Sequence, residues 1–314
     1  MSMKKGKKHI AANLGKASAA ISFSHLLFIA LFAACSTPTV SSDDSDEESS
    51  FSEKTEQDES LSSSGKITSS SSAGGMNCSA LLNGETDWNW DIPKECRFNP
   101  DIDYGTMTDE RDGKVYRTVK IGDQIWMAEN LNFDPGQGGY GEDKYDWSWC
   151  YNDDPRNCDV AGRLYTWAAA IDSVTLATDK DNPLVCGYGR ACELPSMVRG
   201  ICPSGWHLPT ETEWFALLDD VGGLNNAGEN LKSLKGWYNG DNGTDDVGFS
   251  VLPVGYKNGE VPPQYDGVGI GASFWTATEV DSYRTNSMGL FYDIYILYYF
   301  DRKNHGFSIR CLKD

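Results

Sequence analysis

The chain has 314 residues and a formal net charge of −19, with 46 acidic and 27 basic residues. This acidic excess argues against nucleic acids and anionic lipid head groups as partners. The length and the nine cysteines indicate an exported protein with one large, disulfide-containing domain.

Residues 1–34 are typical of a lipoprotein signal peptide. A lysine-rich start precedes an apolar run over 21–34 that is too short for a comfortable membrane span. The run ends Ala33-Ala34-Cys35, which resembles a bacterial lipobox and implies cleavage before Cys35 and lipidation of its thiol. An ordinary secretory signal cleaved nearby is the alternative. Ser36 follows the cysteine, which favours the outer membrane, so we expect a lipid-anchored, surface-exposed protein.

Residues 35–75 contain the lipidated cysteine and then a tether rich in serine and acidic residues. Such a segment cannot bury enough apolar surface to offset the entropy of ordering it. Its like charges favour an extended chain. We therefore expect a disordered tether that holds the folded part away from the membrane.

The other eight cysteines fall mostly in close pairs. No C-x-x-C pair is present and the expected compartment is oxidising, so disulfides are favoured over a metal site. The spacing alone does not decide the pairing. We predict nearest neighbours for three bonds and one long closure, which should stabilise the fold by roughly 4–5 kcal/mol before strain. The predicted pairs are Cys78–Cys96, Cys150–Cys158, Cys186–Cys192 and Cys202–Cys311.

In the first half of the folded part, the sequence predicts a leader, a hairpin and a long loop. We expect residues 76–108 to form a small leader that is closed by a disulfide. Turn signals at 112–113 and 122–123 flank strands over 115–121 and 124–127. Residues 133–155 predict a glycine- and aromatic-rich loop, and 162–170 a first helix.

A second helix, over 210–221, has the clearest signals. Thr210 and Glu213 have the spacing of a capping box, and Gly222-Gly223 can end the helix. Its apolar stripe must be buried against aromatic strands; the stripe consists of Trp214, Leu217, Leu218 and Val221.

The last third predicts a short helix over 226–235 and then strands. We expect a strand over 273–278, a hairpin over 287–300 and a closing strand over 306–311. A few helices followed by short antiparallel strands indicate an α+β domain.

Six motifs in order carry a family resemblance: GKVYRTVKIGDQIWMAENL, GRLYTWAAA, CPSGWHLPTETEW, GFSVLPVGY, FWTATE and GFSIRCLKD. Over 109–314 the chain resembles the Fibrobacter succinogenes major paralogous domain, which implies a surface lipoprotein with an α+β domain. Parts of the third and last motifs also resemble the formylglycine-generating enzyme fold, a relative of C-type lectin-like domains. The expected fold is therefore α+β, disulfide-stapled and lectin-like or formylglycine-generating-enzyme-like. The resemblance implies no activity.

An aromatic cluster in the long loop is the main candidate for ligand binding. Tyr145, Trp147, Trp149 and Tyr151 do not lie on a periodic element. Exposed rings can stack on sugars while nearby polar groups bind hydroxyls. The alternative is that the rings pack the loop onto the body of the domain.

A turn with four oxygen-bearing side chains is a candidate calcium site: Asp241, Asn242, Asp245 and Asp246. It lacks the spacing of an EF-hand loop, and a solvated acidic turn is the alternative. We expect no other cofactor.

Catalysis is the least favoured function. We expect the ring of His207 to bond a main-chain group and His305 to lie in a turn. Chemistry of the formylglycine-generating kind needs a reduced cysteine pair, whereas Cys311 has a structural partner in Cys202. We therefore expect a non-catalytic surface protein that binds a ligand or mediates adhesion, with polysaccharide as the favoured ligand. A structural envelope or protein-interaction role is the second hypothesis and an enzyme the third.

Overall fold

The computed structural model of the chain describes residues 76–140, 143–293 and 296–314. The expected signal peptide, Cys35 and the tether lie outside these residues. In the part that is described, no helix is long and apolar enough to cross a membrane.

The first of two five-stranded sheets contains the predicted hairpin. Its strand order is β1-β2-β3-β14-β8 and every pairing is antiparallel. The hairpin strands have the bounds expected from the sequence, whereas β1 was not predicted. The strands are β1 Gly105–Thr108, β2 Val115–Ile121, β3 Gln124–Met127, β8 Trp206–His207 and β14 Leu312–Lys313.

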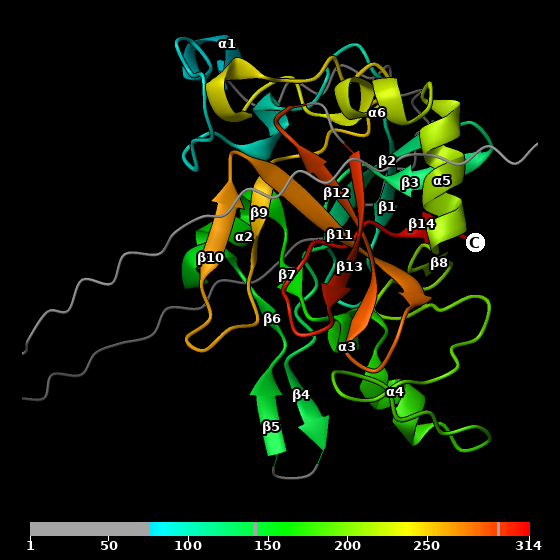
Figure 1. The fold of residues 1–314 in the computed structure, drawn as a ribbon. Helices are drawn as coiled ribbons and strands as arrows, with labels where there is room; N and C mark the ends of the chain where they lie inside the picture. The colour runs from blue at the N-terminus through cyan, green and yellow to red at the C-terminus, as the bar shows by residue number, and fades with distance from the viewer. Residues whose placement is uncertain (1–75, 141–142, 294–295) are drawn as a thin grey trace, which may run out of the picture. The chain divides into compact units, whose positions relative to one another are not determined.

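The second sheet has the order β10-β9-β11-β12-β13 (Figure 1). Its neighbours are antiparallel except β9 and β11, which run parallel with Gly255 opposite Ala272. The expected strand over 273–278 and the expected hairpin over 287–300 both belong to this sheet. The strands are β9 Val254–Lys257, β10 Tyr265–Val268, β11 Gly271–Glu279, β12 Arg284–Phe291 and β13 Ile296–Arg302.

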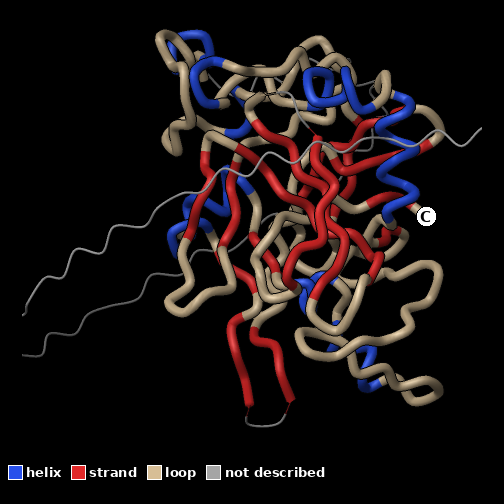
Figure 2. The backbone as a smooth tube through the Cα atoms, in the orientation of Figure 1, coloured by secondary structure: helices blue, strands red, loops and turns tan. Residues whose placement is uncertain are grey.

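Two short strand pairs replace much of the expected loop and of the expected first helix. The β4–β5 pair extends away from the two large sheets (Figure 2), and β6 pairs with β7. The prediction of a helix over 162–170 is therefore wrong in its first half, because β7 forms there and Thr166 caps a helix of only one turn behind it. The strands are β4 Gln137–Tyr140, β5 Asp143–Asp146, β6 Ser148–Trp149 and β7 Leu164–Tyr165.

Six α-helices and three 3₁₀ turns connect the strands in the described residues. The helix predicted over 226–235 is present as α6, which begins and ends a few residues earlier than predicted. The α-helices are α1 Cys78–Leu81, α2 Pro155–Ala161, α3 Trp167–Ala170, α4 Ser173–Thr178, α5 Glu211–Asp220 and α6 Leu224–Leu231. The 3₁₀ turns are η1 Lys94–Cys96, η2 Tyr151–Asp153 and η3 Tyr238–Gly240.

Helix α5 forms as its signals predict. Both bonds of the Thr210–Glu213 capping box are present. Trp214 on its apolar stripe is fully buried. The Trp214 ring lies 4.8 Å from that of Trp126 on β3 and 5.4 Å from that of Phe274 on β11. The helix therefore joins the two large sheets through one aromatic cluster.

The predicted closing strand over 306–311 is wrong. Its residues make only isolated bridges, to Lys257, Tyr165 and Phe274, and the last strand of the chain is β14. A segment that meets three partners in succession cannot form a ladder with any one of them. It instead ties β9, β7 and β11 together.

Arg310, near the end of this segment, is almost completely buried. Its guanidinium donates to the side-chain oxygen of Asn130 and to the main-chain carbonyls of Met127, Phe249 and Ser250. One side chain therefore satisfies acceptors from segments that are far apart in the sequence.

The structure contains all four disulfides expected from the sequence: Cys78–Cys96, Cys150–Cys158, Cys186–Cys192 and Cys202–Cys311. The last joins the segment before β8 to the segment before β14, and these two strands pair. The expected leader packs on the rest of the domain, since Arg97 donates to the main-chain carbonyl of Lys235 and Asn99 to that of Asp245.

Candidate functional site

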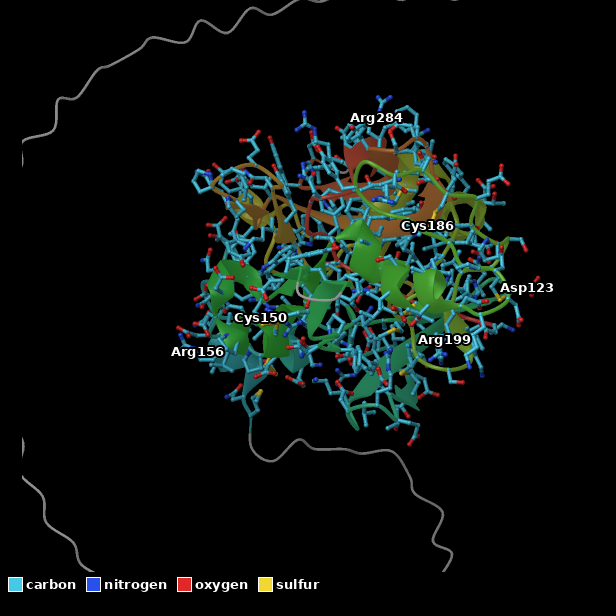
Figure 3. The ribbon with its side chains drawn as sticks, turned by 90° about the horizontal axis from the view of Figure 1, so that it is seen from below. Asp123, Cys150, Arg156, Cys186, Arg199 and Arg284 are labelled. Atoms are coloured by element: carbon cyan, nitrogen blue, oxygen red, sulfur yellow. A yellow bond between two sulfur atoms is a disulfide. The ribbon has the colours of Figure 1, made fainter. Side chains whose placement is uncertain are left out.

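A cleft of about 920 Å³ opens among the described residues. Segments from across the chain line it: β5, β6, the N-cap and first turn of α3, one residue of α4, the loop 185–190, the connection 257–263 and the turn 303–304. Figure 3 views the domain from the end that carries the β4–β5 pair and α4, with Cys186 of the cleft labelled.

The structure divides the predicted aromatic cluster into two pairs. Tyr145 and Trp149 line the cleft, and the side chain of Tyr145 is 47% exposed. Trp147 and Tyr151 are buried, at 4% and 6% exposure. The prediction of four ligand-binding rings is therefore wrong for these two, which pack the segment onto the domain.

Close packing explains why Trp147 turns inward. A Cβ atom on Gly138 of β4 would lie 2.5 Å from the Trp147 ring, so only glycine leaves room for the indole there. The Tyr151 ring lies 5.3 Å from Trp90 of the leader and 5.1 Å from Tyr265 on β10. Both rings thus have protein partners in the space where a sugar was expected.

Trp149 is fixed at the edge of the cleft by a charged network. The Lys257 ammonium lies 4.6 Å from the Trp149 ring centroid and donates to the hydroxyl of Tyr265 over 2.9 Å. The Tyr265 hydroxyl donates to Asp153, whose carboxylate is 3.7 Å from the Lys257 ammonium. Burial lowers the pKa of Lys257, and Asp153 partly offsets that effect. The network holds the indole in one orientation.

One wall of the cleft is the short loop closed by Cys186 and Cys192. The buried ammonium of Lys303 donates to the main-chain carbonyls of Gly187 and Arg190 and forms an ion pair with Glu279. The second carboxylate oxygen of Glu279 accepts from the amide of Cys192 over 2.9 Å. A disulfide and a buried ion pair therefore hold the wall in place.

Tyr188 lies at the tip of that wall and is 49% exposed. It lines the same cleft as Tyr145 and contacts Tyr283, with ring centroids 5.2 Å apart. The exposed charged residues that line the cleft are Asp146, Arg190 and Glu260. Aromatic rings combined with charged and amide groups suit a ligand that has both apolar faces and hydroxyl groups.

No motif or spacing in the sequence marks most of these residues as site residues. Lys257 ends β9, and Asn258, Glu260 and Asn304 lie in connections of ordinary composition; only the fold brings them together with Trp149 in the lining of one cleft. The loop with Tyr188 had one usable signal, the close cysteine pair that encloses it.

The predicted calcium site does not form as a cluster. Asp245 is fully buried and its carboxylate accepts from both the amide and the hydroxyl of Ser250. Burial raises the pKa of Asp245 to about 6, although those hydrogen bonds oppose the shift. Asn242 accepts from the amide of Trp237, while Asp241 and Asp246 are exposed. In the described part of the chain, no three acidic, histidine or cysteine side chains gather as metal ligands would.

The ring of His207 has other hydrogen-bond partners than the expected main-chain group. Its ring contacts two carboxylates, Glu213 at 3.0 Å and Asp314 at 2.8 Å, and no main-chain group. The hydrogen bond to Glu213 is the main cause of a raised pKa of His207, against the opposing effect of burial. His305 lies in the turn after β13, as expected, and burial lowers its pKa.

Comparison with protein families matches residues 119–313 to the Fibrobacter succinogenes major domain. This range contains nearly all of the motifs on which the resemblance was based. Comparisons with curated proteins and with solved structures found no match.

Proposed function

Because the chain belongs to the Fibrobacter succinogenes major domain family, whose membership supplies no activity to transfer, we propose a function from the cleft: this protein is a non-catalytic, polysaccharide-binding or adhesion lipoprotein. Two of the four aromatic residues singled out in the sequence line that cleft. Their position in a preformed hollow is the observation that supports the proposal most strongly.

The size and chemistry of the cleft fit a sugar chain. Its volume of about 920 Å³ lies in the range of roughly 300–1,000 Å³ that is usual for small-ligand sites. Flat rings such as Tyr145 and Trp149 offer apolar faces on which pyranose rings stack. Carboxylates and amides around them accept or donate hydrogen bonds to hydroxyl groups.

The proposal also covers the cellular location and the finer fold class of the protein. Lipidation at Cys35 would anchor the chain in the cell outer membrane, and the tether would let the domain reach polymers beyond the membrane surface. The α+β architecture with mostly antiparallel strands is consistent with a C-type lectin-like or formylglycine-generating-enzyme-like topology, which we propose as its finer class.

Isothermal titration of the purified full chain against soluble plant cell-wall polysaccharides tests the function, with and without calcium. Trp149→Ala and Tyr145→Ala should weaken binding; loss of one stacking contact of about 1 kcal/mol gives roughly a fivefold change. Tyr238→Ala is the matched control, because Tyr238 is 53% exposed, similar to Tyr145, and lies outside the cleft. It should bind as the unaltered chain does.

Two results would contradict the proposal. The intact chain binds no polysaccharide in the panel, or Tyr145→Ala and Trp149→Ala bind as tightly as Tyr238→Ala. Thermal unfolding of each variant shows whether a loss of binding comes from a loss of fold.

A protein-interaction role is the second candidate, and strand β13 favours it. This strand forms an edge of its sheet and exposes Tyr299 and Phe300, the latter by 58%. Exposed aromatic edges are surfaces on which other chains can pair. Association of the purified chain that Phe300→Lys abolishes, together with a cleft that binds no sugar, would favour this role.

A further inference from the structure

A second hollow of about 500 Å³ lies next to the cleft. It shares two lining residues with the cleft, Asp146 and Trp149. The other side chains that matter in it are polar: Asp134, Gln137, Ser148, Asp153 and Arg163. The cleft and the second hollow therefore meet at Trp149 and Asp146.

A single ion pair joins the lining of the cleft to the lining of the second hollow. Lys257 lines the cleft, Asp153 lines the second hollow, and the two form an ion pair at 3.7 Å. The Trp149 ring lies against the same ammonium, at 4.6 Å. A ligand that follows the Trp149 ring out of the cleft therefore enters the second hollow directly.

The second hollow is also preformed. The guanidinium of Arg163 forms an ion pair with Asp134 at 3.0 Å and donates to the Ser148 hydroxyl over 3.2 Å. Its other nitrogen lies near the sulfurs of the Cys150–Cys158 disulfide. Arg163 is therefore engaged on all sides, and a ligand does not have to order this wall when it binds.

The charges select the chemical class of the ligand. Asp134 and Asp153 remain 59% and 69% exposed, and Asp146 is also exposed. Of the cations that line the two hollows, Arg163 and Lys257 are each paired with one of these carboxylates and Lys303 is paired with Glu279, while Arg190 is exposed. Spare carboxylate oxygens accept hydrogen bonds from hydroxyl groups, whereas they repel the carboxylates of an acidic polymer. The net charge of −19 adds a repulsion at longer range.

We propose that the cleft and the second hollow are consecutive subsites for one neutral polysaccharide chain, which passes from one to the other over Trp149. This inference rests on the proposed function and specifies its ligand: a polymer of uncharged sugar units, bound over several units. A single sugar would occupy only one of the two subsites.

The test is titration of the purified full chain with disaccharides, tetrasaccharides and hexasaccharides from cello-, xylo- and manno-oligosaccharide series. Affinity in a bound series should rise by about tenfold or more from disaccharide to hexasaccharide, because the second subsite is then filled. Hexagalacturonate, an acidic chain of equal length, should bind at least about tenfold more weakly than the neutral hexasaccharide.

Gln137→Ala tests the second hollow separately. Gln137 is exposed and lines only that hollow; its removal should lower affinity for the hexasaccharide by about threefold or more and leave the disaccharide unchanged. Gln264→Ala is the control, because Gln264 is also exposed and lines neither hollow.

The outcomes separate the two proposals. If the disaccharide binds as tightly as the hexasaccharide, or Gln137→Ala changes neither affinity, the second subsite is wrong while the polysaccharide function stands. If hexagalacturonate binds best, the neutral class is wrong. If no oligosaccharide and no polysaccharide binds, both proposals fall.

Discussion

Replacing Cys202 and Cys311 by serine removes the disulfide that closes the longest loop in the described residues. The two cysteines are 109 residues apart and fully buried. In the chain-entropy treatment, a loop of this length restricts the unfolded state by about 4.8 kcal/mol at 25 °C. The double variant should lose about that much free energy of unfolding.

The Cys186–Cys192 disulfide provides the comparison within the same protein. Its cysteines are 6 residues apart, and the same treatment gives about 2.2 kcal/mol. For a domain of this size, 1 kcal/mol shifts the Tm by roughly 2–4 °C. We therefore expect the Tm to fall by about 10–19 °C for Cys202→Ser/Cys311→Ser and by about 4–9 °C for Cys186→Ser/Cys192→Ser.

The two variants should also differ in binding. Only the short disulfide closes the wall that carries Tyr188, so only its loss should release that wall while the domain remains folded. Urea unfolding followed by circular dichroism measures the free energies, and titration with polysaccharide below both transitions measures the affinity. Equal losses of stability, or a larger loss for the short disulfide, would refute the loop-length reasoning.

Three further predictions concern the buried polar groups and the cysteines. The raised pKa of His207 means that its charged form stabilises the fold fully below the unfolded value of about 6.5. That contribution is lost as the pH rises through the higher folded value, so the fall in Tm across this range should be absent from His207→Gln. Arg310→Met leaves buried carbonyls without donors and should cost at least about 3 kcal/mol in urea unfolding; a cost below about 1 kcal/mol would contradict the packing account. Thiol titration of denatured, unreduced Cys35→Ala chain should find no free thiol, since the remaining cysteines are paired; two or more free thiols would support the enzyme hypothesis.

Elements whose causes are local could be predicted from the sequence. Helix α5 has its capping box, apolar stripe and terminal glycines within about four turns of chain, and it forms where these signals place it. The β2–β3 hairpin follows from a two-residue turn between alternating strands. The close cysteine pairs are joined as neighbours because short loops bring their sulfurs together.

Long-range pairing overturned the other expectations. Residues 162–170 contain good helix formers, but Leu164 and Tyr165 pair with Ser148 and Trp149 and so become a strand. The expected closing strand alternates as a strand should, yet three different segments take its hydrogen-bonding groups in turn. No spacing within either stretch reveals its distant partners.

The candidate site shows the same limit most clearly. Tyr145, Trp147, Trp149 and Tyr151 are two residues apart, so on one continuous strand they would share a face. Instead the chain changes partner at Trp147, since β5 pairs with β4 and β6 pairs with β7. That break turns Trp147 into the core and leaves Tyr145 and Trp149 in the cleft. The four aromatic residues could be identified from the sequence. Which of their rings a ligand can reach depends on the strands that lie beside them, and those strands are brought there by the tertiary fold.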